Sequence, residues 1–407
     1  MQRGLRARLS LMMFLQYAVW GAWFVPFATY LTHHGLQDSV GWIYSAQGWA
    51  AIAAPLFIGA LADRYFAAEK VMGVLHLFAA LLLFVLTMIG ADAGLMFLGT
   101  LGVLLAFMPT IALSNTIALN ALDDNEKQFP AIRVFGTIGW IVAGLVVGVV
   151  LPGDAERTAQ PILFAAALSL AYGVYSFTLP RTPPRAGEAR PSVTALLGLD
   201  AIRTSDRSFW VLIVCSMLMM VPFSFYNVYA NPFLDDIGVA NPAATQTIGQ
   251  VSEVAFLLAL PLFLRWFSIR GVLFIGMAAW AVRYVIFANA FTAAGPIEPL
   301  VYAGLALHGV GFDFVFVAAT IWIGNRFAAE ECNRAQSFLA LMTWGVGYLV
   351  GTNVANAVQV GTGSGGESNW QSFWLMPAGF AGITAVIFLL LFRDRRKNLP
   401  VVAEGSI

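Results

Sequence analysis

Long apolar runs alternate with short polar breaks along the whole chain of 407 residues. The runs lie near residues 9–31, 41–62, 70–90, 94–119, 131–151, 161–179, 208–234, 245–267, 271–291, 299–325, 335–360 and 370–392. Most are about 20 residues long, which as an α-helix crosses a hydrocarbon core of about 30 Å. The pattern therefore predicts an all-α membrane protein with twelve transmembrane helices.

The longest polar break, 181–207, is rich in Pro and Arg and separates six predicted spans from six. We therefore expect two six-helix halves, residues 1–180 and 208–407, joined by a linker. A weak internal repeat supports this division, because PLFIGALADR at 55–64 aligns with PLFLRWFSIR at 261–270. An alignment this short in apolar sequence can also arise by chance.

Composition agrees with a membrane protein, since 59% of the residues are hydrophobic and 11% are charged, against roughly 25% charged in soluble proteins. Lys plus Arg and Asp plus Glu both number 22, which gives no indication of a nucleic-acid partner, and none is expected. Nineteen of the 22 basic residues fall at the ends of spans that would lie on one side with both termini. Arg157 alone falls on the other side. The positive-inside rule then predicts that both termini and the linker are cytoplasmic.

Four charged residues lie inside predicted spans: Arg133, Glu253, Arg283 and Asp313, with His308 shortly before Asp313. A charge at the bilayer centre costs about 2.5–3.5 kcal/mol on insertion scales, so such side chains face a cavity or a partner. Structural ion pairs between helices are the alternative, particularly for Arg283. Depth along the spans permits Glu253 to pair with Arg283 and Asp313 with Arg133, but rotation about the helix axes leaves both pairings open.

Helical spacing places polar side chains on common faces. Arg133, Thr137 and Trp140 are four and three residues apart, and Gln250 and Glu253 are three apart, so each set forms one stripe. A carboxylate without a fixed cation in such a cavity can take up a proton on one side of the membrane and release it on the other. We therefore predict proton coupling.

Asn227 and Asn231 are four residues apart and share a face with neighbouring aromatic residues. Amides, aromatic rings and a charged group together would suit a planar, polar solute. The alternative for the two Asn residues is hydrogen bonding between helices, which membrane proteins often use.

No pattern indicates an enzyme. The chain lacks a GxxxxGK[ST] phosphate-binding loop and a nucleophile elbow, and its four His and two Cys have no metal-ligand spacing. We expect no cofactor and no metal. His33 and His34 are expected in the loop after the first span.

The two-half, twelve-span architecture resembles the major facilitator superfamily. The loop GALADRYFAAEK is similar to that superfamily's loop motif, with Gly59, Asp63 and Arg64 at matching positions. A short charged turn is the alternative interpretation of this stretch.

Several further stretches resemble the bacterial nucleoside:proton symporters of that superfamily: FLQYAVWGAWFVPFATYL, MPTIALSNTIALN, FPAIRVFGTIGW, TALLGLDA, GQVSE, GFDFVF and WQSFWLMPAG. The resemblance implies uptake of nucleosides with protons. It implies a substrate site made of Arg133, Thr137, Trp140, Asn227, Gln250, Glu253 and Phe312. Asp313, Glu253 and His308 are the candidates for proton coupling. Ser224 and His308 stand where family members can carry Gln and Tyr, which leaves the base preference open.

The prediction is thus a proton-coupled nucleoside importer of the bacterial inner membrane that works by alternating access, as a monomer. A symporter for sugars or another polar solute would share the same fold and a charged cavity. A membrane receptor built on a carrier fold is a further alternative, which the short loops disfavour.

Overall fold

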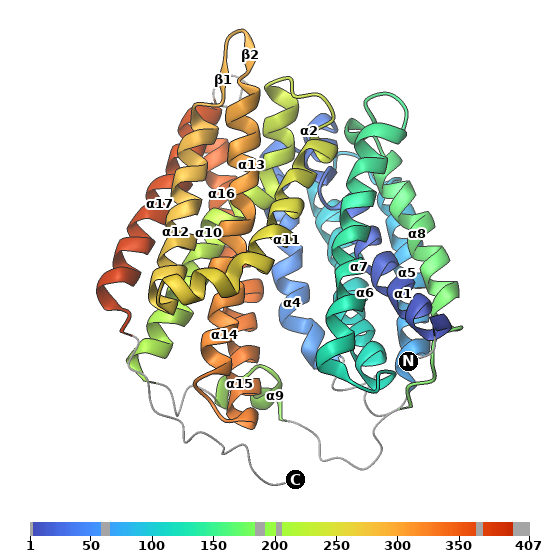
Figure 1. Ribbon diagram of the computed structural model, residues 1–407. Helices are drawn as coiled ribbons and strands as arrows, with labels where there is room; N and C mark the ends of the chain where they lie inside the picture. The colour runs from blue at the N-terminus through green and yellow to red at the C-terminus, as the bar shows by residue number, and fades with distance from the viewer. Residues whose placement is uncertain (1–2, 58–65, 184–191, 201–205, 364–368, 394–407) are drawn as a thin grey trace.

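The computed structural model describes residues 3–57, 66–183, 192–200, 206–363 and 369–393, and it is helical almost throughout (Figure 1). The elements up to residue 183 are α1 (Arg3–Trp23), α2 (Phe27–His33), η1 (Gln37–Ser39), α3 (Val40–Tyr44), α4 (Ala46–Phe57), α5 (Ala68–Leu86), α6 (Ala93–Asn120), α7 (Asn125–Leu145), η3 (Val146–Val150), η4 (Ala155–Arg157) and α8 (Gln160–Ser176). The later elements are α9 (Val193–Leu196), α10 (Arg207–Asp236), α11 (Pro242–Trp266), α12 (Ile269–Ala288), β1 (Phe291–Thr292), β2 (Gly295–Pro296), α13 (Glu298–Phe312), η6 (Asp313–Val317), α14 (Ala318–Gly324), α15 (Ala329–Ala340), η7 (Leu341–Gly347), α16 (Tyr348–Thr362) and α17 (Trp370–Leu391).

Ten helical segments within the described residues are long and apolar enough to cross a membrane. The predicted span 161–179 corresponds to α8, which has 17 residues. The predicted span 41–62 corresponds to α3 and α4, and α4 is described only as far as Phe57. The loop motif with Gly59, Asp63 and Arg64 lies outside the described residues. The all-helical prediction is confirmed, while the count of twelve spans stays a prediction.

Capping side chains set the starts of several helices, and one of these starts differs from the hydropathy prediction. Asp124 accepts a hydrogen bond from the backbone N–H of Lys127, so α7 begins at Asn125 rather than near 131. Asp92 and Asp206 cap α6 and α10 in the same way. A side-chain oxygen at this position satisfies backbone donors that have no partner within the helix. Arg133 consequently lies well inside its helix.

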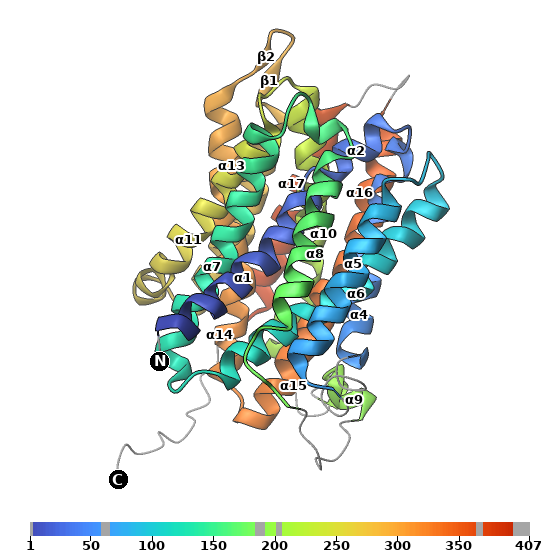
Figure 2. The ribbon, with the colours of Figure 1, turned by 90° about the vertical axis from the view of Figure 1, so that its right-hand side faces the viewer.

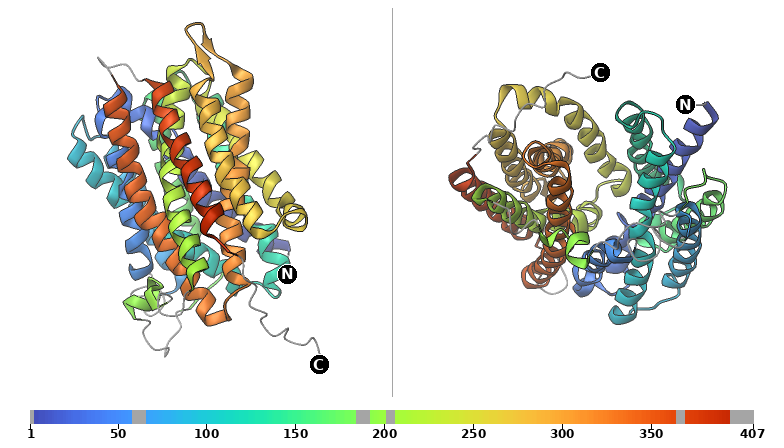
Figure 3. Two further views of the ribbon diagram at one scale, coloured as in Figure 1. Left: turned by 90° about the vertical axis from the view of Figure 1, so that its left-hand side faces the viewer. Right: turned by 90° about the horizontal axis from the view of Figure 1, so that it is seen from below.

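The helices up to residue 183 lie on one side of the molecule and those after residue 206 on the other (Figure 3). Figure 2 shows α1 running between α7 and α8, and it packs against both. Across the two sides, α7 contacts α11, α2 contacts α10, and α4 contacts η7. The β1–β2 hairpin lies at the end of the bundle opposite to the start of α1 (Figure 1). We call these the hairpin end and the terminal end.

Glycines allow the helices around the interior to approach closely. A Cβ atom added at Gly139 of α7 would meet the backbone oxygen of Phe14 of α1. One added at Gly309 of α13 would meet the backbone of Ser252 of α11, and the Gly309 N–H donates to Ser252 Oγ at 2.9 Å. Small residues are the usual means of close helix packing in membranes. These contacts fix α1 against α7 and α11 against α13.

Replacing Gly139 with Ala should destabilise the bundle, because the added methyl group cannot fit against the α1 backbone. We expect a loss of about 1–3 kcal/mol, as in other overpacked interiors. Thermal unfolding followed by Trp fluorescence measures it. Gly379→Ala is the matched control, since nothing lies within 4 Å of a Cβ added there. Equal unfolding temperatures for the two variants would show that α1 and α7 are not held this tightly.

Candidate functional site

A cavity of about 470 Å³ lies between the helices of the two sides. Its wall is mixed, with one cation, one carboxylate and several amides among many aromatic rings. The lining residues are Tyr17, Trp20, Phe24, Val25, Gln47, Ala51, Met108, Ile111, Arg133, Thr137, Trp140, Gly144, Phe223, Tyr226, Asn227, Ala243, Gln246, Thr247, Gln250, Glu253, His308, Phe312 and Trp344.

All seven residues predicted to bind substrate line this cavity. They come from four helices: Arg133, Thr137 and Trp140 from α7, Asn227 from α10, Gln250 and Glu253 from α11, and Phe312 from α13. His308 lines it as well. The fold therefore brings together the residues that the family resemblance implied, including the stripes on α7 and α11 that helical spacing had indicated.

Helix α7 shows how the sequence achieves this. Arg133, Thr137 and Trp140 face the cavity, whereas Val134 and Ile138 are 40% exposed on the outer surface. Outward apolar side chains suit a lipid environment, and polar ones turn toward the interior. The polar face of α7 thus points inward and its apolar face outward, the reverse of a surface helix in a soluble protein.

Arg133 pairs with an aromatic residue that the sequence analysis did not single out. Its Nη2 donates to the hydroxyl oxygen of Tyr17 at 2.7 Å, and its guanidinium carbon lies 4.1 Å from the centroid of that ring. A hydrogen bond and a cation–π contact together stabilise the charge without a carboxylate. No ion pair joins Arg133 to Asp313 among the described residues. The guanidinium remains accessible to the cavity.

Asn227 and Asn231 have different roles despite sharing a helical face. Asn227 is the one residue of 219–234 that is not buried, and its Oδ1 accepts a hydrogen bond of 2.6 Å from the Tyr348 hydroxyl. Asn231 is buried and accepts a hydrogen bond from the Thr29 hydroxyl of α2. Both Asn residues thus make helix-to-helix hydrogen bonds, but only Asn227 of the two also lines the cavity.

Glu253, His308 and Arg283 form a row that leads from the cavity into the protein. The Glu253 side chain is 29% exposed, and its Oε2 lies 3.8 Å from His308 Nε2. His308 Nδ1 lies 3.1 Å from Nη1 of Arg283, which is completely buried. The imidazole of His308 thus lies between Glu253 and Arg283 and contacts both. Glu253 and Arg283 form no direct ion pair among the described residues.

Asp313 is buried, 1% exposed, and does not belong to the cavity lining. It begins the π-helical segment η6, directly after the lining residue Phe312. Its Oδ2 has no hydrogen-bond partner among the described residues. The structure therefore places Asp313 behind the cavity wall rather than in it, at a local helix irregularity of a kind that often marks functional sites.

The sequence analysis missed several lining residues, among them Tyr17, Trp20, Gln47 and Trp344. Aromatic residues make up 14% of the chain, so their type alone did not distinguish those in the cavity. Gln47 carries a usable signal, because an uncharged amide in an apolar span needs a partner or a cavity. Its Oε1 is buried without a partner among the described residues.

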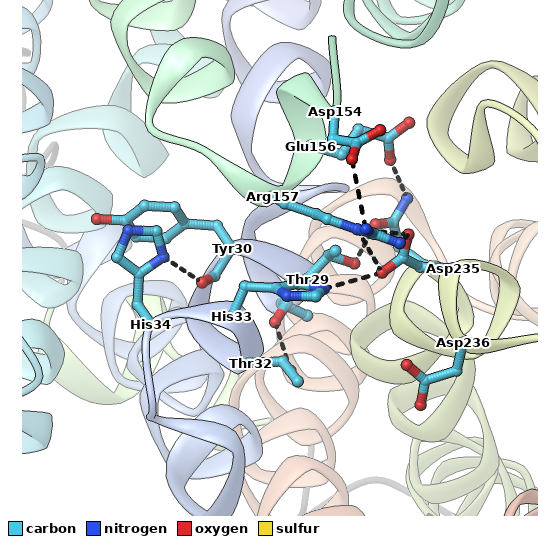
Figure 4. A network of polar contacts seen from close by, with 12 residues as sticks. Thr29, Tyr30, Thr32, His33, His34, Asp154, Glu156, Arg157, Asp235 and Asp236 are labelled. Atoms are coloured by element: carbon cyan, nitrogen blue, oxygen red, sulfur yellow. Dashed lines mark hydrogen bonds and ion pairs between the residues drawn. The ribbon is translucent and has the colours of Figure 1, made fainter.

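A second cluster of polar residues joins the two sides at the hairpin end, and we call it the hairpin-end network (Figure 4). Its members are Thr29, His33, Asp154, Glu156, Arg157, Asn231, Asp235 and Ala243. Arg157 Nη2 donates to Asp235 Oδ1 at 2.9 Å, and His33 Nε2 lies 3.0 Å from Asp235 Oδ2. His33 was expected in a loop, but it is the last residue of α2 and faces α10 across this contact.

Glu156 is the most buried carboxylate of this network, 7% exposed. Its Oε2 accepts a hydrogen bond of 2.7 Å from Asn231 Nδ2, and its Oε1 accepts one of 3.0 Å from the Ala243 N–H. Burial raises the pKa of Glu156, although these hydrogen bonds act in the opposite direction. The hydrogen bond to Asp235 raises the pKa of Arg157.

Comparisons with known proteins agree on one family. The family model described as "Nucleoside H+ symporter" matches residues 3–397. The putative nucleoside transporter YegT of Escherichia coli K12 is 36% identical, over 97% of this chain and 96% of that protein. The xanthosine permease of the same organism is 33% identical over 95% of each.

Solved structures agree with this result. A crystal structure of the nucleoside transporter NupG superimposes with a TM-score of 0.86 at 30% identity, over 96% of this chain and 100% of that one. A peptide transporter of the POT family, 16% identical with a TM-score of 0.72 over 97% of each chain, shares the fold alone. The helical bundle is therefore that of major facilitator transporters.

The raised pKa of Glu156 predicts how the hairpin-end network responds to pH. The closed network favours the protonated carboxyl, so its stability is fully present below the ordinary pKa of Glu, about 4.3, and falls as pH rises through the raised value. Spin labels at Pro152→Cys and Ala240→Cys should therefore move apart as pH increases. Glu156→Gln should remove that part of the response, and Asp154→Asn, an exposed carboxylate nearby, should not. An unchanged pH response in Glu156→Gln would contradict this assignment.

Proposed function

This chain belongs to the nucleoside H⁺ symporter family, and we propose that it imports nucleosides together with protons across the bacterial inner membrane. The observation that carries the proposal is the central cavity. It presents Arg133 and Glu253 together with side-chain amides and aromatic rings on helices from both sides of the bundle. A nucleoside needs these three kinds of partner, because it combines a planar base with a hydroxylated sugar.

The chemistry of the lining supports one role for each residue. Trp140 and Phe312 offer faces on which a base can stack. Asn227 and Gln250 offer amides that donate and accept hydrogen bonds, as the edge of a base requires. Arg133 offers a charged donor, and Thr137 a hydroxyl, for the sugar or for an oxygen of the base. The residues lie on different helices, so substrate binding would draw the two sides together.

Glu253, Asp313 and His308 are the candidates for proton coupling, and the two carboxylates are the candidates that we propose here. Glu253 is open to the cavity, whereas Asp313 is buried outside the cavity lining, and the charge of Glu253 acts on Asp313. We propose that Glu253 exchanges its proton with the cavity and that Asp313 senses the charge of Glu253. Arg133 favours the charged form of Glu253, so a substrate that engages Arg133 would favour proton uptake.

Alternating access is the proposed mode of transport. In this proposal residues 1–180 and 208–407 are two six-helix halves that rock around the cavity, and residues 181–207 connect them. The hairpin end would face the outside, where the hairpin-end network holds the halves together, and both termini would be cytoplasmic. The cavity is complete within one chain, so a monomer suffices.

Two alternative functions remain testable. A proton symporter for sugars or another polar solute would use the same charged cavity. A receptor built on this fold would bind a solute without moving protons. Uridine uptake that nucleosides inhibit and sugars do not would favour the first proposal over both alternatives.

Uptake by reconstituted proteoliposomes tests the function. With an inward proton gradient, we expect accumulation of radiolabelled uridine or adenosine above the external concentration and acidification of the lumen on substrate addition. Free bases and sugars serve as competitors. Accumulation of a sugar alone would support the sugar symporter, and binding without proton movement would support the receptor.

Arg133→Ala should impair uptake without preventing insertion, because it removes a charged donor from the cavity wall. The apparent affinity for nucleoside should fall by about 10- to 100-fold, as the loss of a charged hydrogen bond of about 1.5–3 kcal/mol implies. Arg265→Ala, an exposed cation near the end of α11, is the control. Normal uptake by Arg133→Ala would exclude this role.

Glu253→Gln and Asp313→Asn separate substrate binding from energy coupling, because an amide keeps the shape of the side chain but cannot release a proton. The variant that carries the coupling should lose gradient-driven accumulation and keep downhill exchange of nucleoside. We expect this result for Glu253→Gln. Full gradient-driven accumulation by both variants would remove both carboxylates from the coupling step.

A further inference from the structure

Arg283 is a cation that the proposed transport cycle does not use, although it is completely buried in α12. No carboxylate lies within ion-pair distance of it among the described residues. Its guanidinium carbon lies 3.4 Å from the centroid of the Tyr226 ring and 5.1 Å from that of Trp280. Its Nε and Nη2 have no hydrogen-bond partner among the described residues. A buried charge without a counter-charge is costly, so the polar contact closest to its guanidinium among the described residues needs an explanation.

That contact is with His308. Nη1 of Arg283 lies 3.1 Å from His308 Nδ1. A guanidinium has five N–H donors and no acceptor, and it stays protonated, so Nδ1 must be the acceptor. The neutral imidazole then carries its single N–H on Nε2. A doubly protonated ring would set an N–H and a second positive charge against the guanidinium.

The surroundings hold His308 in this orientation. The ring stacks near Phe312, with centroids 5.7 Å apart, and lies beside Tyr226 at 5.0 Å. The next residue, Gly309, is bound to Ser252 Oγ, which fixes α13 against the turn of α11 that carries Glu253. Rotating the imidazole by 180° would exchange Nδ1 for carbon and leave Arg283 without its acceptor. Arg283 therefore selects one of the two ring orientations.

We propose that Arg283 is a positioning residue, which holds His308 neutral with its Nε2–H presented to Glu253 at the cavity wall. The proposal rests on the proposed function insofar as Glu253 exchanges the transported proton. His308 then serves as a fixed hydrogen-bond donor and does not carry the proton itself. The single N–H can donate either to the Glu253 carboxylate or to an acceptor on the substrate. Substrate binding would therefore be linked to the protonation of Glu253.

Other charged and titratable groups on neighbouring helices lie around Glu253, His308 and Arg283. They are Arg133 of α7, Asp313 of η6, Tyr17 of α1 and Tyr226 of α10. Arg133 acts on Glu253, and Glu253 acts on Asp313, without the imidazole of His308 as an intermediary. A test of Arg283 must therefore observe His308 directly, in addition to transport.

The direct test is ¹⁵N NMR of the full chain in nanodiscs with ¹⁵N-labelled imidazole. The chain has four His residues, and His308→Phe identifies the signal to assign. We expect His308 to show an unprotonated Nδ1 and a protonated Nε2, unchanged between about pH 5 and 8, where an ordinary His titrates. Arg283→Met should make the ring titrate or mix tautomers. Arg283→Gln, whose amide can still donate, should keep the wild-type tautomer.

Transport supplies the second readout. In Arg283→Met a protonated imidazole could form next to Glu253, so the pH of half-maximal nucleoside uptake should move to lower pH by about one unit. The same substitution in a His308→Phe background should add no such shift, because Arg283 acts through His308. Tyr284→Phe is the structural control, since it removes a buried hydrogen bond to the Pro222 oxygen from the same helix.

A protonated Nδ1 in the wild-type protein would overturn the proposal, and so would Arg283→Met with an unchanged tautomer and pH profile. If Arg283→Met and Tyr284→Phe shifted the pH of half-maximal uptake equally, Arg283 would have only a structural role. The NMR measurement needs no substrate. A wild-type tautomer as expected, together with an absence of nucleoside uptake, would therefore reject the proposed function and leave the positioning of His308 intact.

Discussion

An ionised side chain away from bulk water must be solvated by the protein, and this constraint determines how the interior of the bundle is built. The chain meets it in three ways. Arg133 is held by the ring and hydroxyl of Tyr17, and Glu253 stays partly exposed in the cavity. Arg283 is enclosed by aromatic faces and one imidazole. The first two solutions leave a charge available to a ligand, and the third directs its effect through His308.

Close helix packing makes these arrangements possible. The Arg133 and Tyr17 side chains occupy the space that a Cβ at Gly136 would need, and Gly139 lets the α1 backbone reach α7. Gly309 does the same for α13 and α11. Backbones held this close bring polar side chains from two helices within hydrogen-bond distance. The glycines therefore contribute to the site without touching a ligand.

Part of this could be predicted from the sequence, and the physical reason is helical periodicity. Spacing of four and three residues fixes Arg133, Thr137 and Trp140 on one face, and the charge identifies that face as the inner one. Tyr17 could not be selected in the same way, because its role depends on how α1 is rotated against α7. Asp313 was expected to face a cavity or a partner, but it lies outside the cavity lining, where the π-helical segment that begins at Asp313 leaves Phe312 at the wall.

The hairpin end, where the two sides of the bundle meet, differs in chemistry from the cavity. At the hairpin end the two sides meet through Arg157, Asp235, Asn231 and Glu156, whose hydrogen bonds can be exchanged for hydrogen bonds with water. Exposed ion pairs contribute only about 0–1 kcal/mol each, and the buried Glu156 carboxyl opposes closure when it is charged. An apolar seal of the same area would cost far more to separate, at about 25 cal/mol per Å². A closure made of polar contacts is therefore one that a modest change in binding energy at the cavity can open and remake.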